Sequence, residues 1–179
     1  MEGIPGSVGG SLRMNAGAMG AETFQQVVNV RVVNMRGEFE ILTPEMMQVN
    51  YRNVPTLRDR FVVSAVFRGT RARIEEIEKR LDIAGQKRRS TQPIAASAGC
   101  IFKNPVECPA GKLVEELGLK NKTIGAARVS EIHGNFIVNE GEATARDVIH
   151  LISEIQARAK AERGIDLQTE VQIVGVDDD

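Results

Sequence analysis

Between residues 27 and 67, hydrophobic and polar positions alternate in places or form short valine-rich runs, and both patterns are typical of β-strands. The stretch VVNVRVV at residues 27–33 predicts a strand, because it alternates and is rich in a β-branched residue. MRGE at residues 35–38 predicts a turn, and the run at residues 39–42 predicts its hairpin partner. FVVSAVF at residues 61–67 predicts a further strand, which we expect to be buried on both faces.

The pattern changes near residue 70, where hydrophobic residues begin to recur at helical spacing among charges. Ile74, Ile77 and Leu81 keep this spacing, so residues 70–89 predict an amphipathic helix. A switch from strands to a charged helix is the best candidate for a domain boundary. We therefore expect one domain over residues 1–70 and a second over residues 71–179.

The second half of the chain mixes helices and strands. AGKLVEELGL predicts a short helix that ends at Gly118, and NFIVN at residues 135–139 predicts a strand. Thr144, with Asp147 three residues later, resembles a capping box that opens a long helix ending at Gly164. The expected buried stripe of that helix is Val148, Ile149, Leu151, Ile152 and Ile155.

EVQIVGV at residues 170–176 predicts a closing strand. The order of elements predicts an α+β fold with mostly antiparallel strands.

Composition excludes several classes of function. Lys and Arg total 23 against 24 Asp and Glu, so no net field favours nucleic acid or an anionic membrane. Aromatic residues are only 4% of the chain, which argues against stacking on single-stranded nucleic acid. No hydrophobic run approaches the ~20 residues that a membrane span needs, and the N-terminus lacks the pattern of a signal peptide.

Two cysteines in 179 residues indicate a reducing compartment, so we expect a cytoplasmic protein without disulfides. His133 and His150 are far apart in sequence and no CxxC is present, so we expect no metal site.

Several residues are candidates for chemistry, but each also has an ordinary structural explanation. Cys100 lies in SAGCIFKNP, and a lone cysteine is most often a small buried hydrophobic residue. The glycine-rich GIPGSVGG can let backbone approach a phosphate or a flat ring, or it can be a flexible segment. Arg88 and Arg89 can bind a diphosphate, or can favour a helix C-terminus. Arg52 and Glu170 are each typical of exposed residues, and spacing alone does not join them to Cys100.

Five segments, taken together, closely resemble the UDP-N-acetylenolpyruvoylglucosamine reductase family over essentially the whole chain. The chain is most similar to the shorter of the two types in that family. The segments are GIPGSVGGSLRMNAGAMG (residues 3–20), NYRN (50–53), QPIAASAGCIFKNP (92–105), HGNFIVNEGEATARDV (133–148) and IDLQTEVQIVG (165–175).

The resemblance implies a two-electron reduction in peptidoglycan biosynthesis. In the family, NADPH reduces FAD, and the flavin then transfers a hydride to UDP-N-acetylglucosamine enolpyruvate, giving UDP-N-acetylmuramate. By motif, Arg52 would stabilise the enol or enolate, Glu170 would assist as an acid, and Cys100 would stand at the proton donor, where most members have serine. A thiol, with a pKa near ~8.5, is a competent acid at neutral pH.

The resemblance also implies residues that bind the cofactor and the substrate. The substrate residues would be Tyr51, Arg88, Arg89, Lys103 and Asn104. The FAD residues would be Gly3, Ile4, Pro5, Gly6, Ser7, Gly9, Gly10, Asn15, Ala16 and Gly17. Cys108 matches no functional position, and Gly134 stands where the family usually has alanine.

Family members carry a further flavin-binding segment before the position of Gly3. The resemblance therefore implies the second half of an FAD-binding α+β domain, followed by a smaller α+β substrate-binding domain. We expect a fragment, a truncated gene product or a mis-assigned start. The alternative function is a non-catalytic relative that binds the UDP-sugar only.

Overall fold

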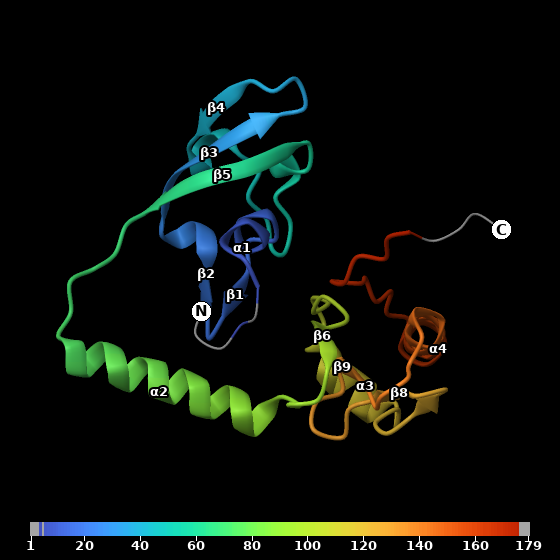
Figure 1. Ribbon diagram of the computed structural model, residues 1–179. Coiled ribbons are helices and arrows are strands. Elements are labelled where there is room, and N and C mark those ends of the chain that lie inside the picture. The colour runs from blue at the N-terminus through green and yellow to red at the C-terminus, as the bar shows by residue number, and fades with distance from the viewer. Residues whose placement is uncertain (1–3, 5, 176–179) are drawn as a thin grey trace. The chain divides into compact units, whose positions relative to one another are not determined.

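The computed structural model describes residue 4 and residues 6–175, and Figure 1 labels its helices and strands. The chain divides into two compact units, residues 1–86 and residues 87–179. This division falls inside helix α2 (Ile74–Thr91), while the hydrophobic pattern placed the domain boundary at residue 70. Helix α2 buries none of its side chains, so packing does not assign it to either domain. The exact boundary of the two domains therefore stays a prediction.

The first unit is built on a three-stranded antiparallel sheet in the order β4-β3-β5, which confirms the three predicted strands. Val30 of the central strand pairs with Leu42 on one side and with Ala65 on the other. A short helix and a two-stranded hairpin precede the sheet. The elements are α1 (Val8–Arg13), β1 (Gly17–Ala18), β2 (Ala21–Glu22), η1 (Thr23–Gln25), β3 (Val27–Asn34), β4 (Phe39–Leu42), η2 (Pro44–Met46), η3 (Pro55–Leu57) and β5 (Arg60–Phe67).

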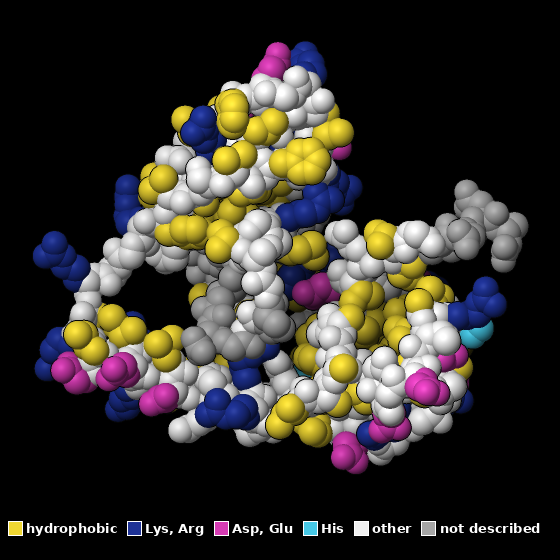
Figure 2. All heavy atoms as spheres, viewed as in Figure 1, with side chains coloured by type: hydrophobic (Ala, Val, Ile, Leu, Met, Phe, Trp, Pro, Cys, Tyr) yellow, Lys and Arg dark blue, Asp and Glu magenta, His cyan; other side chains and the backbone are white. Residues whose placement is uncertain are grey.

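One face of this sheet is buried and the other is exposed. Val30, Val32 and Leu42 pack with Leu12 and Leu57 in the core of the unit. The opposite face exposes five large hydrophobic side chains, and Figure 2 shows hydrophobic side chains gathered over the first unit. The expectation that β5 is buried on both faces was therefore wrong for the described residues. The exposed hydrophobic face consists of Phe39, Ile41, Phe61, Val63 and Val66.

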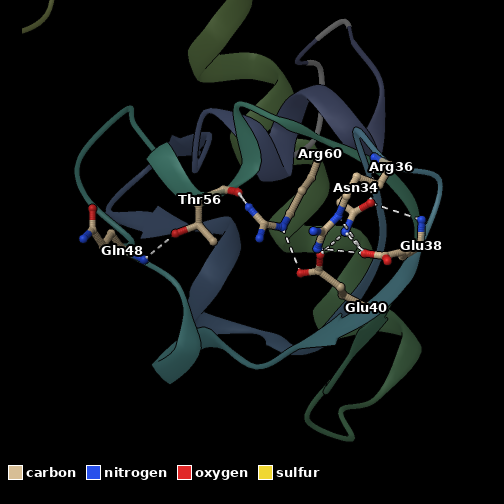
Figure 3. Close-up of polar contacts among 7 residues, drawn as sticks. All are labelled: Asn34, Arg36, Glu38, Glu40, Gln48, Thr56 and Arg60. Atoms are coloured by element: carbon tan, nitrogen blue, oxygen red, sulfur yellow. Dashed lines mark hydrogen bonds and ion pairs between the residues drawn. The ribbon is translucent and has the colours of Figure 1, made fainter.

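A polar network joins the two edge strands of the sheet (Figure 3). The Arg60 Nε atom donates to Glu40 Oε2 at 3.0 Å, and its Nη1 atom donates to the Thr56 carbonyl at 3.0 Å. Asn34 Nδ2 donates to Glu40 Oε1 at 2.8 Å. The hydrogen bond from Asn34, and then that from Arg60, lower the pKa of Glu40. The network therefore ties β4 and β5 to the end of β3.

The second unit combines a four-stranded antiparallel sheet, in the order β6-β9-β8-β7, with two helices. Its core is formed by Ile101 and Phe102, by the buried faces of the helices, and by alternate residues of the central strands. The predicted short helix and the strand at residues 135–139 are both confirmed. The elements are β6 (Ser97–Cys100), α3 (Ala110–Glu116), β7 (Thr123–Ile124), β8 (Ala127–Val129), β9 (Phe136–Asn139) and α4 (Ala145–Arg163).

The long helix α4 begins and ends as its sequence predicts. The Thr144 side chain accepts from the Asp147 N–H, and the Asp147 side chain accepts from the Thr144 N–H, which makes the capping box reciprocal. Gly164 ends the helix with φ +68°, a backbone conformation that favours glycine. Leu151, Ile152 and Ile155 are buried, as the stripe requires, while Val148 and Ile149 are half-buried.

The predicted closing strand is wrong over the described residues 170–175. Just before the segment, Thr169 forms an isolated antiparallel bridge with Phe102, and Val171 packs against the core, but residues 170–175 form no strand. Two backbone hydrogen bonds flank this bridge, from Glu170 N to the Ile101 carbonyl at 2.7 Å and from Lys103 N to the Gln168 carbonyl at 2.9 Å. Strand β6 itself ends at Cys100, so this contact lies beyond it.

No helix among the described residues is long and hydrophobic enough to cross a membrane. Within the same part of the chain, no three residues among the histidines, cysteines and carboxylates gather into a group that could hold a metal ion.

Candidate functional site

Arg52 lies in a tight turn in which Asn50 and Asn53 exchange two backbone hydrogen bonds, of 2.9 and 3.2 Å. Its φ is +52°, which is uncommon for a residue with a side chain. The guanidinium Nη2 donates to the Gly17 carbonyl at 2.8 Å, and its central carbon lies 4.8 Å from the centre of the Tyr51 ring, which is itself exposed. The turn therefore brings the predicted catalytic arginine against a residue of the predicted cofactor segment, 35 positions earlier.

The Asn15 side chain, which is almost wholly buried, is hydrogen-bonded to this turn. Its Nδ2 atom donates to Glu22 Oε2 at 2.8 Å and to the Asn50 carbonyl at 3.3 Å. Its Oδ1 atom accepts from the Phe24 N–H at 3.2 Å. Asn15 also has a positive φ, +42°, so two strained residues are packed together, and such clusters gather at functional sites.

The Asn15 carboxamide is thus engaged within the first unit, although the sequence predicted a cofactor contact for this residue. Glu22 belongs to the same cluster and was missed by sequence reasoning. Its only signal is structural, because Glu22 pairs with Gly17 across the β1–β2 hairpin.

The glycine-rich segment turns directly into a helix. Ser7 caps helix α1, its Oγ atom accepting from the Gly10 N–H at 3.1 Å, so Gly9 and Gly10 are helical and not part of a loop. Gly6 has φ +149°, and a Cβ atom there would meet no atom within 4 Å. This open, bare backbone fits a group that must approach the chain closely.

The other predicted cofactor residues are placed as follows. Ile4, Ala16 and Gly17 are half-buried. Gly3 and Pro5 lie outside the described residues.

Cys100 lies at the end of β6 in the second unit, half-buried, and pairs in register with Phe136. The adjoining Ile101 carbonyl accepts the backbone N–H of Glu170 at 2.7 Å. The fold therefore brings the backbone of Glu170 next to the residue that follows Cys100, across 69 positions of sequence. Arg52 belongs to the first unit, so its convergence with Cys100 and Glu170 stays a prediction.

The predicted substrate residues of the second unit lie near its start. Asn104 is exposed, and its Oδ1 atom accepts the Ala110 N–H at 2.9 Å, which fixes the carboxamide at the beginning of α3. Lys103 is half-buried on the neighbouring position. Arg88 is half-buried and Arg89 exposed, both in the last turn of α2.

His133 and Asn135 are further residues that sequence reasoning did not single out for the site. The backbone N–H of Asn135 donates to His133 Nδ1 at 3.1 Å, and the His133 ring packs edge-on against Phe136. Burial lowers the pKa of His133, so its neutral form is favoured and Nδ1 can accept. Between them, a Cβ atom on Gly134 would lie 2.5 Å from the Gly111 carbonyl oxygen, so the backbone here packs too closely for a side chain.

Comparison with protein families and solved structures gives consistent matches. Residues 91–174 match the model of the UDP-N-acetylenolpyruvoylglucosamine reductase C-terminal domain. A UDP-N-acetylenolpyruvoylglucosamine reductase of Bacillus pumilus is 43% identical over 176 residues, covering 97% of this chain and 58% of that protein. Another, of Bacillus licheniformis, is 43% identical and covers 97% of this chain and 96% of that protein.

A crystal structure of UDP-N-acetylenolpyruvylglucosamine reductase from Thermus caldophilus matches with a TM-score of 0.85 and 36% identity. The match covers 95% of this chain and 61% of that one. The chain thus spans slightly more than half the length of most of the curated relatives it matches. For example, it also covers 58% of the length of the Nitrobacter hamburgensis relative.

Proposed function

Because the chain belongs to the UDP-N-acetylenolpyruvoylglucosamine reductase family, we propose that it contributes to the reduction of UDP-N-acetylglucosamine enolpyruvate to UDP-N-acetylmuramate. The reaction is that of a FAD-dependent oxidoreductase that uses NADPH, and it supplies peptidoglycan synthesis in the cytoplasm. The observation that carries the proposal is the backbone pairing of Glu170 beside Ile101, because it joins two predicted catalytic segments within one unit.

In this proposal FAD, when bound, supplies the hydride to the enolpyruvyl group. Gly6, Ser7, Gly9 and Gly10 would line one side of the cofactor, because their backbone is open or capped at the start of α1. The residues of the chain itself would bind the substrate and manage its charge and its proton.

Arg52 would stabilise the negative charge that develops on the enolate, for which a fixed guanidinium is suited. Its hydrogen bond to the Gly17 carbonyl and its contact with Tyr51 hold the side chain in place before substrate arrives. Glu170 would assist this stabilisation as an acid. Tyr51, Lys103, Asn104 and one of the arginines at the end of α2 would bind the UDP-sugar.

Cys100 would donate the proton to C2 of the substrate. An ordinary thiol, with a pKa of about 8.5, is mostly protonated at neutral pH and is a better acid than a hydroxyl. The half-buried position of Cys100 at a strand end is compatible with this role.

The test compares Cys100→Ala and Cys100→Ser with Cys108→Ser as control. Turnover would be measured with excess FAD and NADPH in the chain joined to the N-terminal part of the Bacillus pumilus relative, because the chain alone is expected to be inactive. We expect Cys100→Ala to retain flavin reduction by NADPH and to lose turnover about 100-fold or more, the usual contribution of a general acid. Cys100→Ser should keep much of the activity.

The pH dependence gives a second readout. Turnover should fall as the thiol ionises, because a thiolate has no proton to give, and Cys100→Ser should lack that alkaline limb. Normal turnover by Cys100→Ala would show that Cys100 is only a core thiol. Binding of the UDP-sugar by every variant without turnover would favour a non-catalytic binding protein.

A further inference from the structure

Asn135 is a buried polar residue whose side chain makes hydrogen bonds of the kind that a neighbouring strand would make. It lies just before β9 and is 3% exposed. Its Oδ1 atom accepts the Phe102 N–H at 2.8 Å, and its Nδ2 atom donates to the Phe102 carbonyl at 2.8 Å. One carboxamide therefore satisfies both backbone groups of a buried residue, which a β-ladder would otherwise do.

The segment that follows Cys100 needs such a partner. The pairing of β6 with β9 is irregular between Ser97 and Cys100, and β6 ends at Cys100. Beyond it, the Asn135 carbonyl accepts the Ile101 N–H at 2.9 Å, and on the other side the Ile101 carbonyl accepts the Glu170 N–H. Asn135 thus supplies three of the hydrogen bonds that fix residues 101 and 102.

Asn135 is itself held rigidly. Its backbone N–H donates to His133 Nδ1 at 3.1 Å, and the preceding Gly134 lies so close to the Gly111 carbonyl that a Cβ atom would not fit. Because the Asn135 side chain is fixed, its two hydrogen bonds also fix the backbone of Phe102.

We propose that Asn135 is the positioning residue for Cys100. By holding Ile101 and Phe102, it sets the location and the exposure of the thiol at the end of β6. The inference deepens the proposed function, on which it rests for the catalytic role of Cys100. The property that it predicts, the reactivity of one thiol, is measured without cofactor or substrate, so it can hold or fail independently of turnover.

The experiment follows alkylation of each cysteine by iodoacetamide between about pH 7 and 10, the range in which thiols ionise, with peptide mass spectrometry. We expect Asn135→Ala to raise the limiting alkylation rate of Cys100 about tenfold or more, because an unsatisfied buried backbone group promotes local opening. Cys108, which packs against the core of the same unit, should keep its rate.

Asn139→Ala is the matched control. Asn139 is the last residue of β9, and its carboxamide also makes two backbone hydrogen bonds, but its Oδ1 atom accepts both of them, from Gly141 and Ala143 in the following turn. The same deletion there should leave the Cys100 profile unchanged.

A Cys100 profile in Asn135→Ala that superimposes on that of the wild type would overturn the proposal. An equal rise at Cys108 would do so as well, because it would report general loosening of the unit. Amide hydrogen exchange of the wild type needs no variant to fold. In the wild type, the Phe102 N–H donates to the Asn135 side chain and the Val129 N–H donates to a backbone carbonyl. We expect the two amides to exchange equally slowly, and rapid exchange at Phe102 would contradict the inference.

Discussion

The ring of His133 is the clearest case in this chain of a residue whose protonation state matters to packing. Its Nδ1 atom accepts the Asn135 N–H, so the nitrogen must be unprotonated. Burial lowers the pKa of His133 from its usual 6.5 and outweighs a backbone hydrogen bond that raises it, and the effects of nearby charges are smaller still. A depressed histidine pKa means that the unfolded chain binds the proton more readily than the folded one, so the stability of the second unit falls as pH drops below about 6.5.

We predict that His133→Asn removes part of this pH dependence. An asparagine oxygen can accept the same N–H and does not titrate. Between the lowered pKa of His133 and about pH 6.5, the free energy of unfolding of the wild type should fall with decreasing pH, by at most the amount that the binding of one proton gives. Chemical unfolding curves recorded at several pH values should show a weaker pH dependence for the variant. His150→Asn, an exposed position, serves as the control and should keep the slope of the wild type. Equal slopes in all three proteins would contradict the assignment.

Elements whose signals lie within a few residues could be predicted from the sequence. The capping box of α4, the glycine at its end and the alternation of β3 each depend on neighbours in sequence, and the structure confirms them. Residues 170–176 have an equally good strand pattern, but the bridge to Phe102 is made by Thr169 just before them, and no strand forms over residues 170–175. Propensity gave no information about that partner.

The candidate site depends on contacts that no local pattern contains. Arg52 is held by a carbonyl 35 residues earlier, and Phe102 is held by a side chain 33 residues later. Arg52 and Cys100 were found through resemblance to a family, and Asn135 could be recognised only once its two hydrogen bonds were visible.

The β1–β2 hairpin gives a prediction at the scale of an element. A Cβ atom on Gly17 would lie 2.6 Å from the Ala21 carbonyl oxygen and 3.2 Å from the Arg52 Nη1 atom. Gly17→Ala should therefore lower the free energy of unfolding of the first unit by about 1–3 kcal/mol, the usual cost of overpacking, and displace Arg52. Gly69→Ala, where a Cβ atom meets nothing within 4 Å, should be nearly neutral in the same thermal and chemical melts. If the two variants melted alike, the hairpin would not be the tight contact that the structure shows.

At the scale of the whole molecule, the chain spans 58% of several curated relatives, and its predicted cofactor residues all come from the first 17 positions. A flavin with its pyrophosphate and adenine needs contacts on several sides. The described part of this segment offers one helix start and one open glycine backbone.

We predict that the 179-residue chain, purified alone, is colourless and does not oxidise NADPH with the enolpyruvyl substrate. The second unit, which has its own core, should remain folded and bind the UDP-sugar weakly. Flavin absorbance, NADPH oxidation and calorimetric titration with the UDP-sugar test the three parts. Stoichiometric, tightly bound FAD would refute the claim of an incomplete cofactor site.

We predict that the exposed hydrophobic face of the β4-β3-β5 sheet promotes association of the chain in concentrated solution. Strand β5 is an edge of that sheet, and its run FVVSAVF combines high β-propensity with no charge. Two chains that meet there can join edge to edge and hide their phenylalanines from water at the same time. Light scattering should therefore rise steeply with protein concentration, and the yield of refolding should fall, unless a mild detergent or a bound partner covers the face.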